Sequence, residues 1–221
     1  VDPAVEPGES VAVGDALGQM VRSGFFGQWV DNHVHLEFRD PEANLYRATG
    51  SLPLAVETEV TAVPWDGTGR VVDTGETFAV LDAPANPSPG SFAAVAGVVG
   101  DGSDESRVST ASRESAVPLD GGLPHYTGGG RFDVHSTQAD DDDDISLLGT
   151  TVGTARGRTV SWNDVEILAN GEPVTGLSLF ASRESGFGVK IVSRPSADEP
   201  SFAVGEEVAV EVVAGEPTRL G

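Results

Sequence analysis

Glycine and proline divide this chain into short segments, and this spacing constrains the fold more than any other feature. The 221 residues include 28 Gly and 14 Pro, and few stretches show the period of an amphipathic helix. Short alternating or apolar runs between turn residues are typical of an all-β sandwich or barrel. We expect strands in the following segments: Ser10–Val13, Val34–Phe38, Leu54–Val63, Arg70–Val72, Thr77–Leu81, Phe92–Val99, Thr159–Ser161, Val165–Leu168, Gly176–Ala181, Val189–Val192 and Glu207–Val213.

A four-residue pattern of glycine, acid, any residue and apolar residue recurs along the chain. It begins at Gly8, Gly14, Gly75 and Gly205. Glycine can adopt positive φ in a tight turn, and we expect the acid to remain in solvent while the apolar residue starts an inward face. The pattern predicts tight turns at the corners of a compact barrel. Chance repetition in an acidic, β-rich chain is the alternative.

The charge of the chain is strongly negative. It has 35 acidic and 13 basic residues, a formal net charge of -22, and Lys190 is its single lysine. Acidic excess with almost no lysine resembles the proteins of salt-loving archaea. At molar salt the Debye length falls to about 3 Å, so acidic self-repulsion becomes tolerable. An acidic surface made for a basic partner is the alternative, although the acids are scattered along the whole chain.

Composition also limits the classes of partner. No basic stripe could neutralise phosphates, so we expect no nucleic acid binding. No run of apolar residues is long enough to predict a membrane span, and no signal-peptide pattern begins the chain, which favours the cytoplasm without settling the localisation. The chain has no Cys, which excludes thiolate sites. A small-molecule or peptide ligand and the oligomeric state stay open.

Two polar segments suggest the domain boundaries. Gly100–Ser115 is rich in Gly, Ser and charged residues, and Gln138–Asp144 contains five consecutive Asp that we expect to form a solvated loop. We therefore predict a barrel-sandwich-like β domain at 1–99, a Gly/Ser/acidic loop region with a His-containing segment at 100–145, and a second β unit at 146–221.

The second β unit contains a strong hairpin signal. Val165–Val174 is a strand, an Asn-Gly turn and a second strand. We expect Trp162, Phe180 and Phe187 to anchor the core around it.

Two histidines in the N-terminal part form the best candidate for a chemical site. His33 and His35 lie in an alternating segment, so on a strand they share one face and are separated by roughly 6.6 Å. Both imidazoles could therefore converge on one metal ion or one reacting group. A polar outer face of a half-buried strand is the structural alternative.

Two stretches around these histidines resemble a known family. Glu6–Gly18 (EPGESVAVGDALG) and Asn32–Arg39 (NHVHLEFR) are similar to the C-terminal hairpin and His-x-His strand of lysostaphin-type zinc metallopeptidase domains. The same hairpin occurs in biotinyl/lipoyl-type barrel-sandwich domains. The resemblance covers residues 5–39 and implies a mainly β fold: a barrel-sandwich-hybrid-like N-terminal half with an appended small β unit.

The resemblance also implies roles for the two histidines. His35 would be a zinc ligand and His33 the catalytic base, with zinc-activated water attacking an amide carbonyl. The family's earlier His-x-x-x-Asp pair has no counterpart in this sequence. The expected function is therefore either a zinc-dependent hydrolase or a non-catalytic barrel-sandwich protein that binds a partner or supports assembly.

The other two histidines lie in one segment, Leu123–His135. Asp133 and His135 share a face if this segment is a strand, and with His125 they could complete a metal site that includes His33 or His35. Loop packing is the alternative. A cupin-like metal barrel also uses His-x-His on a strand, but Glu37 follows the second histidine by only two residues, and this spacing disfavours that fold.

Overall fold

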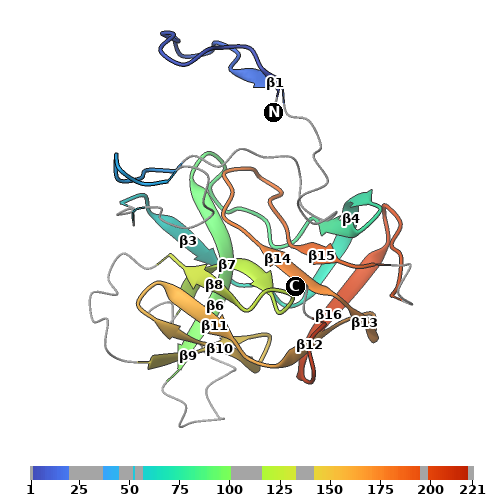
Figure 1. Ribbon diagram of the computed structural model, residues 1–221. Helices are drawn as coiled ribbons and strands as arrows, with labels where there is room; N and C mark the ends of the chain where they lie inside the picture. The colour runs from blue at the N-terminus through green and yellow to red at the C-terminus, as the bar shows by residue number, and fades with distance from the viewer. Residues whose placement is uncertain are drawn as a thin grey trace. The chain divides into compact units, whose positions relative to one another are not determined.

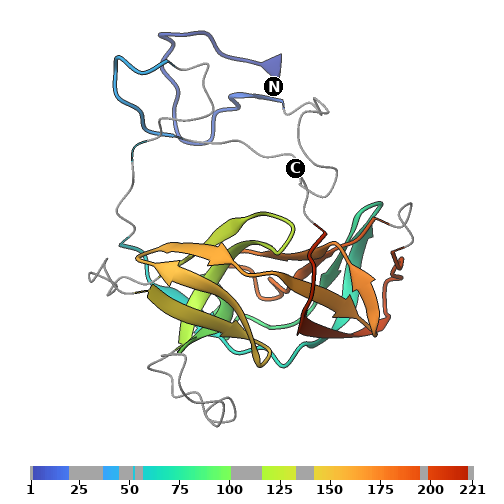
Figure 2. The same cartoon turned by 60° about the horizontal axis from the view of Figure 1, so that its bottom comes forward.

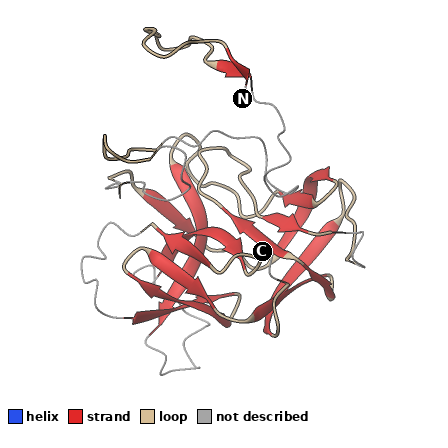
Figure 3. Cartoon of the chain, viewed as in Figure 1, coloured by secondary structure: helices blue, strands red, loops and turns tan. Residues whose placement is uncertain are grey.

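The computed structural model describes residues 2–19, 37–44, 52, 57–100, 116–132, 142–194 and 199–218. The chain splits into two compact units, Val1–Val56 and Glu57–Gly221. The described residues form strands and turns and contain no helix (Figure 3). Over the same residues, no helix is long and apolar enough to cross a membrane.

The first unit contains one two-stranded pairing. β1 (Asp2–Pro3) and β2 (Gly18–Gln19) are antiparallel, with Asp2 opposite Gln19 and Pro3 opposite Gly18. The Ala4 N–H donates to the Leu17 carbonyl at 3.0 Å and extends the pairing.

The second unit is one extensively paired sheet with fourteen strands (Figure 1). The strands are β3 (Val60–Val63), β4 (Thr68–Gly75), β5 (Phe78–Leu81), β6 (Phe92–Gly100), β7 (Ala116–Leu123), β8 (Gly128–Arg131), β9 (Asp142–Leu147), β10 (Thr150–Arg156), β11 (Thr159–Trp162), β12 (Val165–Ala169), β13 (Glu172–Val174), β14 (Gly176–Leu179), β15 (Lys190–Val192) and β16 (Glu207–Ala214).

Six of these strands close into an antiparallel barrel. Its order is β6–β7–β8–β11–β10–β9, and β9 pairs back onto β6. From β7 the sheet continues away from the barrel through β14, β15, β5, β4, β16, β12 and β13, while β3 runs parallel to β6. Figure 2 shows green β6 and β7 with yellow-orange β9–β11 on one side, and teal β4 with red β16 on the other.

Alternation explains why the outer strands form. In β16, Val208, Val210 and Val212 are buried, whereas Glu207 and Glu211 are exposed. A period of two places each set on its own face of the sheet. The valines therefore join the apolar core, and the glutamates remain in solvent.

The prediction of a mainly β, barrel-like fold is confirmed, but the closed barrel is built from strands β6 to β11, which lie between Phe92 and Trp162. The observed division at 56/57 also differs from the boundaries at 99 and 146. β6 pairs with β9, with Val98 opposite Ser146, and β5 pairs with β15, with Val80 opposite Lys190. The segments before and after the loop region thus supply each other's hydrogen-bonding partners and form one unit.

The region 100–145 contains more regular structure than the sequence indicates. β7, β8 and the start of β9 lie within it, although it was expected to be a loop region. The Asn-Gly hairpin is confirmed as β12 and β13, and Trp162 and Phe187 are buried as expected, at 5% and 3% exposure. Phe180 packs against the same core.

The glycine-acid pattern forms the same turn at three places. Gly8, Gly14 and Gly205 have φ of 92°, 99° and 92°. In each turn the backbone N–H of the following acid donates to the carbonyl three residues earlier, at 3.0 or 3.1 Å. Positive φ at the third position with this hydrogen bond is typical of a type II β-turn. The predicted positive-φ turn is confirmed at these three glycines.

The acid of each turn has a structural role that the sequence did not reveal. The carboxylates of Glu9, Asp15 and Glu206 accept hydrogen bonds from the backbone N–H of the first turn residue at 3.1, 2.8 and 3.0 Å. These acids therefore stabilise their turns while they face solvent.

Gly75, the fourth glycine of the pattern, differs from the other three. Its φ is not positive, and an added Cβ would lie 2.3 Å from the Phe78 ring.

Gly205→Ala and Gly186→Ala form a matched pair that isolates the backbone term. An added Cβ meets nothing within 4 Å at either glycine, but φ is positive at Gly205 and not at Gly186. We expect Gly205→Ala to lower the free energy of unfolding by about 1 kcal/mol, and Gly186→Ala to change it by less than about 0.5 kcal/mol. Urea denaturation measures both, and equal losses would contradict this explanation.

Candidate functional site

The interior of the barrel is filled by side chains. Leu119 on β7 and Ile145 on β9 are fully buried, and Trp162 on β11 is nearly so. Glycines make room for them, because an added Cβ at Gly97 would lie 2.8 Å from Leu119 Cδ1, and one at Gly129 would lie 2.4 Å from Trp162 Cζ2. In small barrels of this kind, side chains fill the interior and form a hydrophobic core.

One end of the barrel carries a shielded ion pair. Arg131 ends β8, its side chain is 4% exposed, and its Nη2 lies 2.7 Å from Asp143 Oδ2 on β9. Its Nε donates to the Gly157 carbonyl, in the β10–β11 turn, at 2.7 Å. Because β11 and β10 separate β8 from β9 in the barrel order, this pair spans the barrel end. The guanidinium thereby joins β8, β9 and the β10–β11 turn.

The acidic run enters the barrel wall. Asp142, Asp143 and Asp144 form the first half of β9, so the expectation of a solvated loop is wrong for these three residues. Asp142 lies opposite Arg156 on β10 and pairs with its Nη2 at 2.9 Å. Arg131 and Arg156 thus pair with two of the aspartates in this strand, which reduces the repulsion between like charges there. Residues 138–141 lie outside the described residues.

His125 lies in the turn between β7 and β8 and is 1% exposed. A Cβ added at Gly122 would lie 2.5 Å from His125 Nε2, and one added at Gly176 would lie 2.5 Å from His125 Nδ1. β7 and the start of β14 therefore enclose the imidazole. The Tyr126 ring centroid lies 4.9 Å from it. Burial lowers the pKa of His125 from 6.5 to about 4, and a hydrogen bond with the Leu123 backbone acts in the opposite direction. The enclosure favours a neutral, structural imidazole over a metal ligand.

The remaining predicted site residues are His33, His35, Asp133 and His135, and all four lie outside the described residues. Whether they meet His125 therefore stays a prediction. Within the described ranges, no group of three or more His, Cys, Asp or Glu could hold a metal ion.

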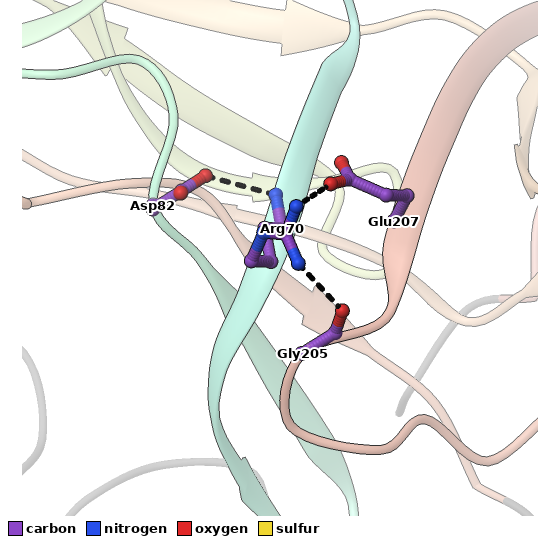
Figure 4. Close-up of polar contacts among 4 residues, drawn as sticks. All are labelled: Arg70, Asp82, Gly205 and Glu207. Carbon is purple, nitrogen blue, oxygen red and sulfur yellow. Dashed lines mark hydrogen bonds and ion pairs between the residues drawn. The ribbon is translucent and has the colours of Figure 1, made fainter.

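Sequence reasoning missed a polar cluster where β4 meets β16 (Figure 4). The Arg70 N–H donates to Asp82 Oδ1 at 2.8 Å, Nη1 donates to the Gly205 carbonyl at 3.2 Å, and Nη2 pairs with Glu207. Both charged side chains are more than half exposed, so the pair itself contributes about 0–1 kcal/mol. The cluster fastens the start of β16 to β4, and only the Gly205-Glu206 pattern signalled it in the sequence.

A second cluster surrounds Glu199. Its carboxylate accepts hydrogen bonds from the backbone N–H groups of Thr175 and Arg194 at 2.9 and 2.8 Å, and from Thr175 Oγ1. Thr175 is fully buried. The carboxylate therefore satisfies buried donors, which is a structural role.

The described residues define an all-β protein. Its second unit, which begins at Glu57, contains a closed antiparallel barrel with a packed interior. The chain belongs to a family of unknown function. The model described as the C-terminal domain of the domain of unknown function DUF8155 matches residues 61–213, and the N-terminal domain model matches residues 1–56. No curated protein and no solved structure matches the chain.

Asp143→Asn and Asp142→Asn test the shielded pair against an exposed one. We expect Asp143→Asn to lower the free energy of unfolding by about 2 kcal/mol, because a buried guanidinium loses its charged partner. Asp142→Asn should cost less than about 1 kcal/mol, since its pair with Arg156 is solvent-exposed. Chemical denaturation in concentrated salt measures both. Similar losses in the two variants would show that Arg131 does not depend on Asp143.

His125 predicts a pH dependence of stability that a His125→Gln variant lacks. The folded pKa lies below the unfolded one, so the unfolded chain takes up the proton first as pH falls. The stabilisation is complete above pH 6.5 and is lost progressively toward pH 4, by on the order of 3 kcal/mol.

The measurement is the wild-type free energy of unfolding minus that of His125→Gln across this range. Asp120, whose pKa burial raises, and the other carboxylates titrate in both proteins and cancel in the difference. A difference that stays constant with pH would contradict the buried neutral imidazole.

Proposed function

We propose that this protein is a non-catalytic β scaffold that binds a partner or supports assembly. The observation that carries this proposal is the filled barrel. Trp162, Leu119 and Ile145 occupy the interior, which is the space that a ligand-binding barrel leaves for its ligand.

The ionisable groups of the second unit support the same proposal. Arg131 pairs with Asp143 and donates a hydrogen bond to a backbone carbonyl. Burial lowers the pKa of His125 to about 4, so its imidazole is neutral at neutral pH. A catalytic site needs an acid, base or nucleophile that can reach a substrate. These buried groups are directed at the protein itself, so the surface is left to carry the interaction.

A zinc-dependent hydrolase centred on the first unit is the second candidate. It is favoured by the β1–β2 hairpin, whose turns at Gly8 and Gly14 lie in the segment that resembles lysostaphin-type peptidases. In this candidate His35 holds zinc through its imidazole and His33 moves a proton, with a peptide amide as the substrate class.

Zinc stoichiometry distinguishes the two candidates. The acidic composition resembles that of proteins from salt-loving archaea, so the full chain is purified in concentrated salt. It is equilibrated with zinc and washed with a chelator to remove ions bound loosely by surface carboxylates. The scaffold predicts far less than one zinc per chain. A full equivalent that His35→Ala loses and His125→Gln retains would overturn the scaffold in favour of the hydrolase.

A further inference from the structure

The turn between β12 and β13 holds the one Asn-Gly sequence of the chain. Asn170 and Gly171 have φ of 53° and 81°, and both residues are exposed. Positive φ at both central residues is typical of a type I′ hairpin turn. The same dipeptide is the one most prone to deamidation, because glycine leaves the attacking backbone nitrogen unhindered.

Hydrogen bonds attach the Asn170 side chain to β16 and to Glu206, the residue before β16; we call this set of bonds the clamp. Its Oδ1 accepts from the Ala209 N–H at 2.9 Å, and its Nδ2 donates to Glu206 Oε1 at 3.4 Å and to the Glu207 carbonyl at 3.3 Å. The Asn170 N–H also donates to the Ala209 carbonyl at 2.8 Å. The amide therefore connects the hairpin to β16 at the edge of the sheet.

We propose that Asn170 is a spontaneous modification site that this clamp protects while the fold is intact. In the reaction the Gly171 nitrogen attacks Asn170 Cγ, a C–N bond forms, and ammonia leaves with the proton of the Gly171 N–H. Water then opens the succinimide at either carbonyl and gives aspartate or isoaspartate. Cyclisation turns the amide plane and expels Nδ2, so it competes directly with the hydrogen bonds to β16.

The product cannot restore the clamp. An aspartate at 170 still accepts from the Ala209 N–H, but it places a carboxylate oxygen where Nδ2 donated to Glu206 and to the Glu207 carbonyl. Three acceptors then face one another, and two of them are charged carboxylates. Isoaspartate also lengthens the turn backbone. An episode of local unfolding is thereby converted into a permanent loss of this attachment.

Peptide mapping by mass spectrometry tests the protection. The full chain is incubated folded in concentrated salt, and in urea at the same pH, and the conversion at Asn170 is followed over time. Asn163, which precedes Asp164, is the control in the same digest. In urea we expect Asn170 to convert faster than Asn163. In the folded chain we expect its conversion to slow by at least about tenfold, since it follows the locally opened population.

Equal rates at Asn170 in the folded and denatured chains would overturn the proposal, as would conversion in urea no faster than at Asn163. A second measurement tests the consequence with Asn170→Asp, and with Asn163→Asp as the matched control. We expect the melting temperature of Asn170→Asp to fall by about 2–4 °C more than that of the control. Equal melting temperatures would show that the product does keep the clamp.

Discussion

β6 pairs with both β7 and β9, and this double pairing closes the barrel. Val98 lies opposite Ala116 of β7 on one side and opposite Ser146 of β9 on the other. Without this closure, the six strands would be an open sheet with two exposed edges. Closure removes those edges, encloses the apolar side chains of the barrel strands, and brings Arg131 within reach of Asp143 across the barrel end.

The sensitivity of an arginine–carboxylate ion pair to salt depends on how far its side chains are buried. Arg70 and Arg156 pair with carboxylates that are more than half exposed, and salt screens such pairs effectively. The Arg131 side chain is 4% exposed and its pair with Asp143 is partly shielded, so this contact persists at ionic strengths that weaken the others. Salt therefore weakens this contact, which barrel closure positions, less than it weakens the two exposed pairs.

Local patterns predicted much of the outer sheet and little of the barrel. Alternation identified β16, and Asn170-Gly171 identified the β12–β13 hairpin, because each signal lies within a few adjacent residues. β7 and β8 were missed because Gly122 and Gly129 resemble loop residues. Those glycines are required by His125 and Trp162, whose rings lie where a Cβ would be. For the candidate site, the sequence nominated His125 as a ligand, but only its enclosure between two strands indicates a structural role.

Residue type and short spacing were enough to indicate the β class, the glycine-acid turns and the acidic character of the chain. The division at 56/57, the neutral state of His125 and the ion pairs of Asp142 and Asp143 with arginines emerge only in the folded chain. These properties depend on which strands and turns lie side by side in the folded chain. Burial and charge partners depend on which segments meet in space, and no local pattern of residues encodes that.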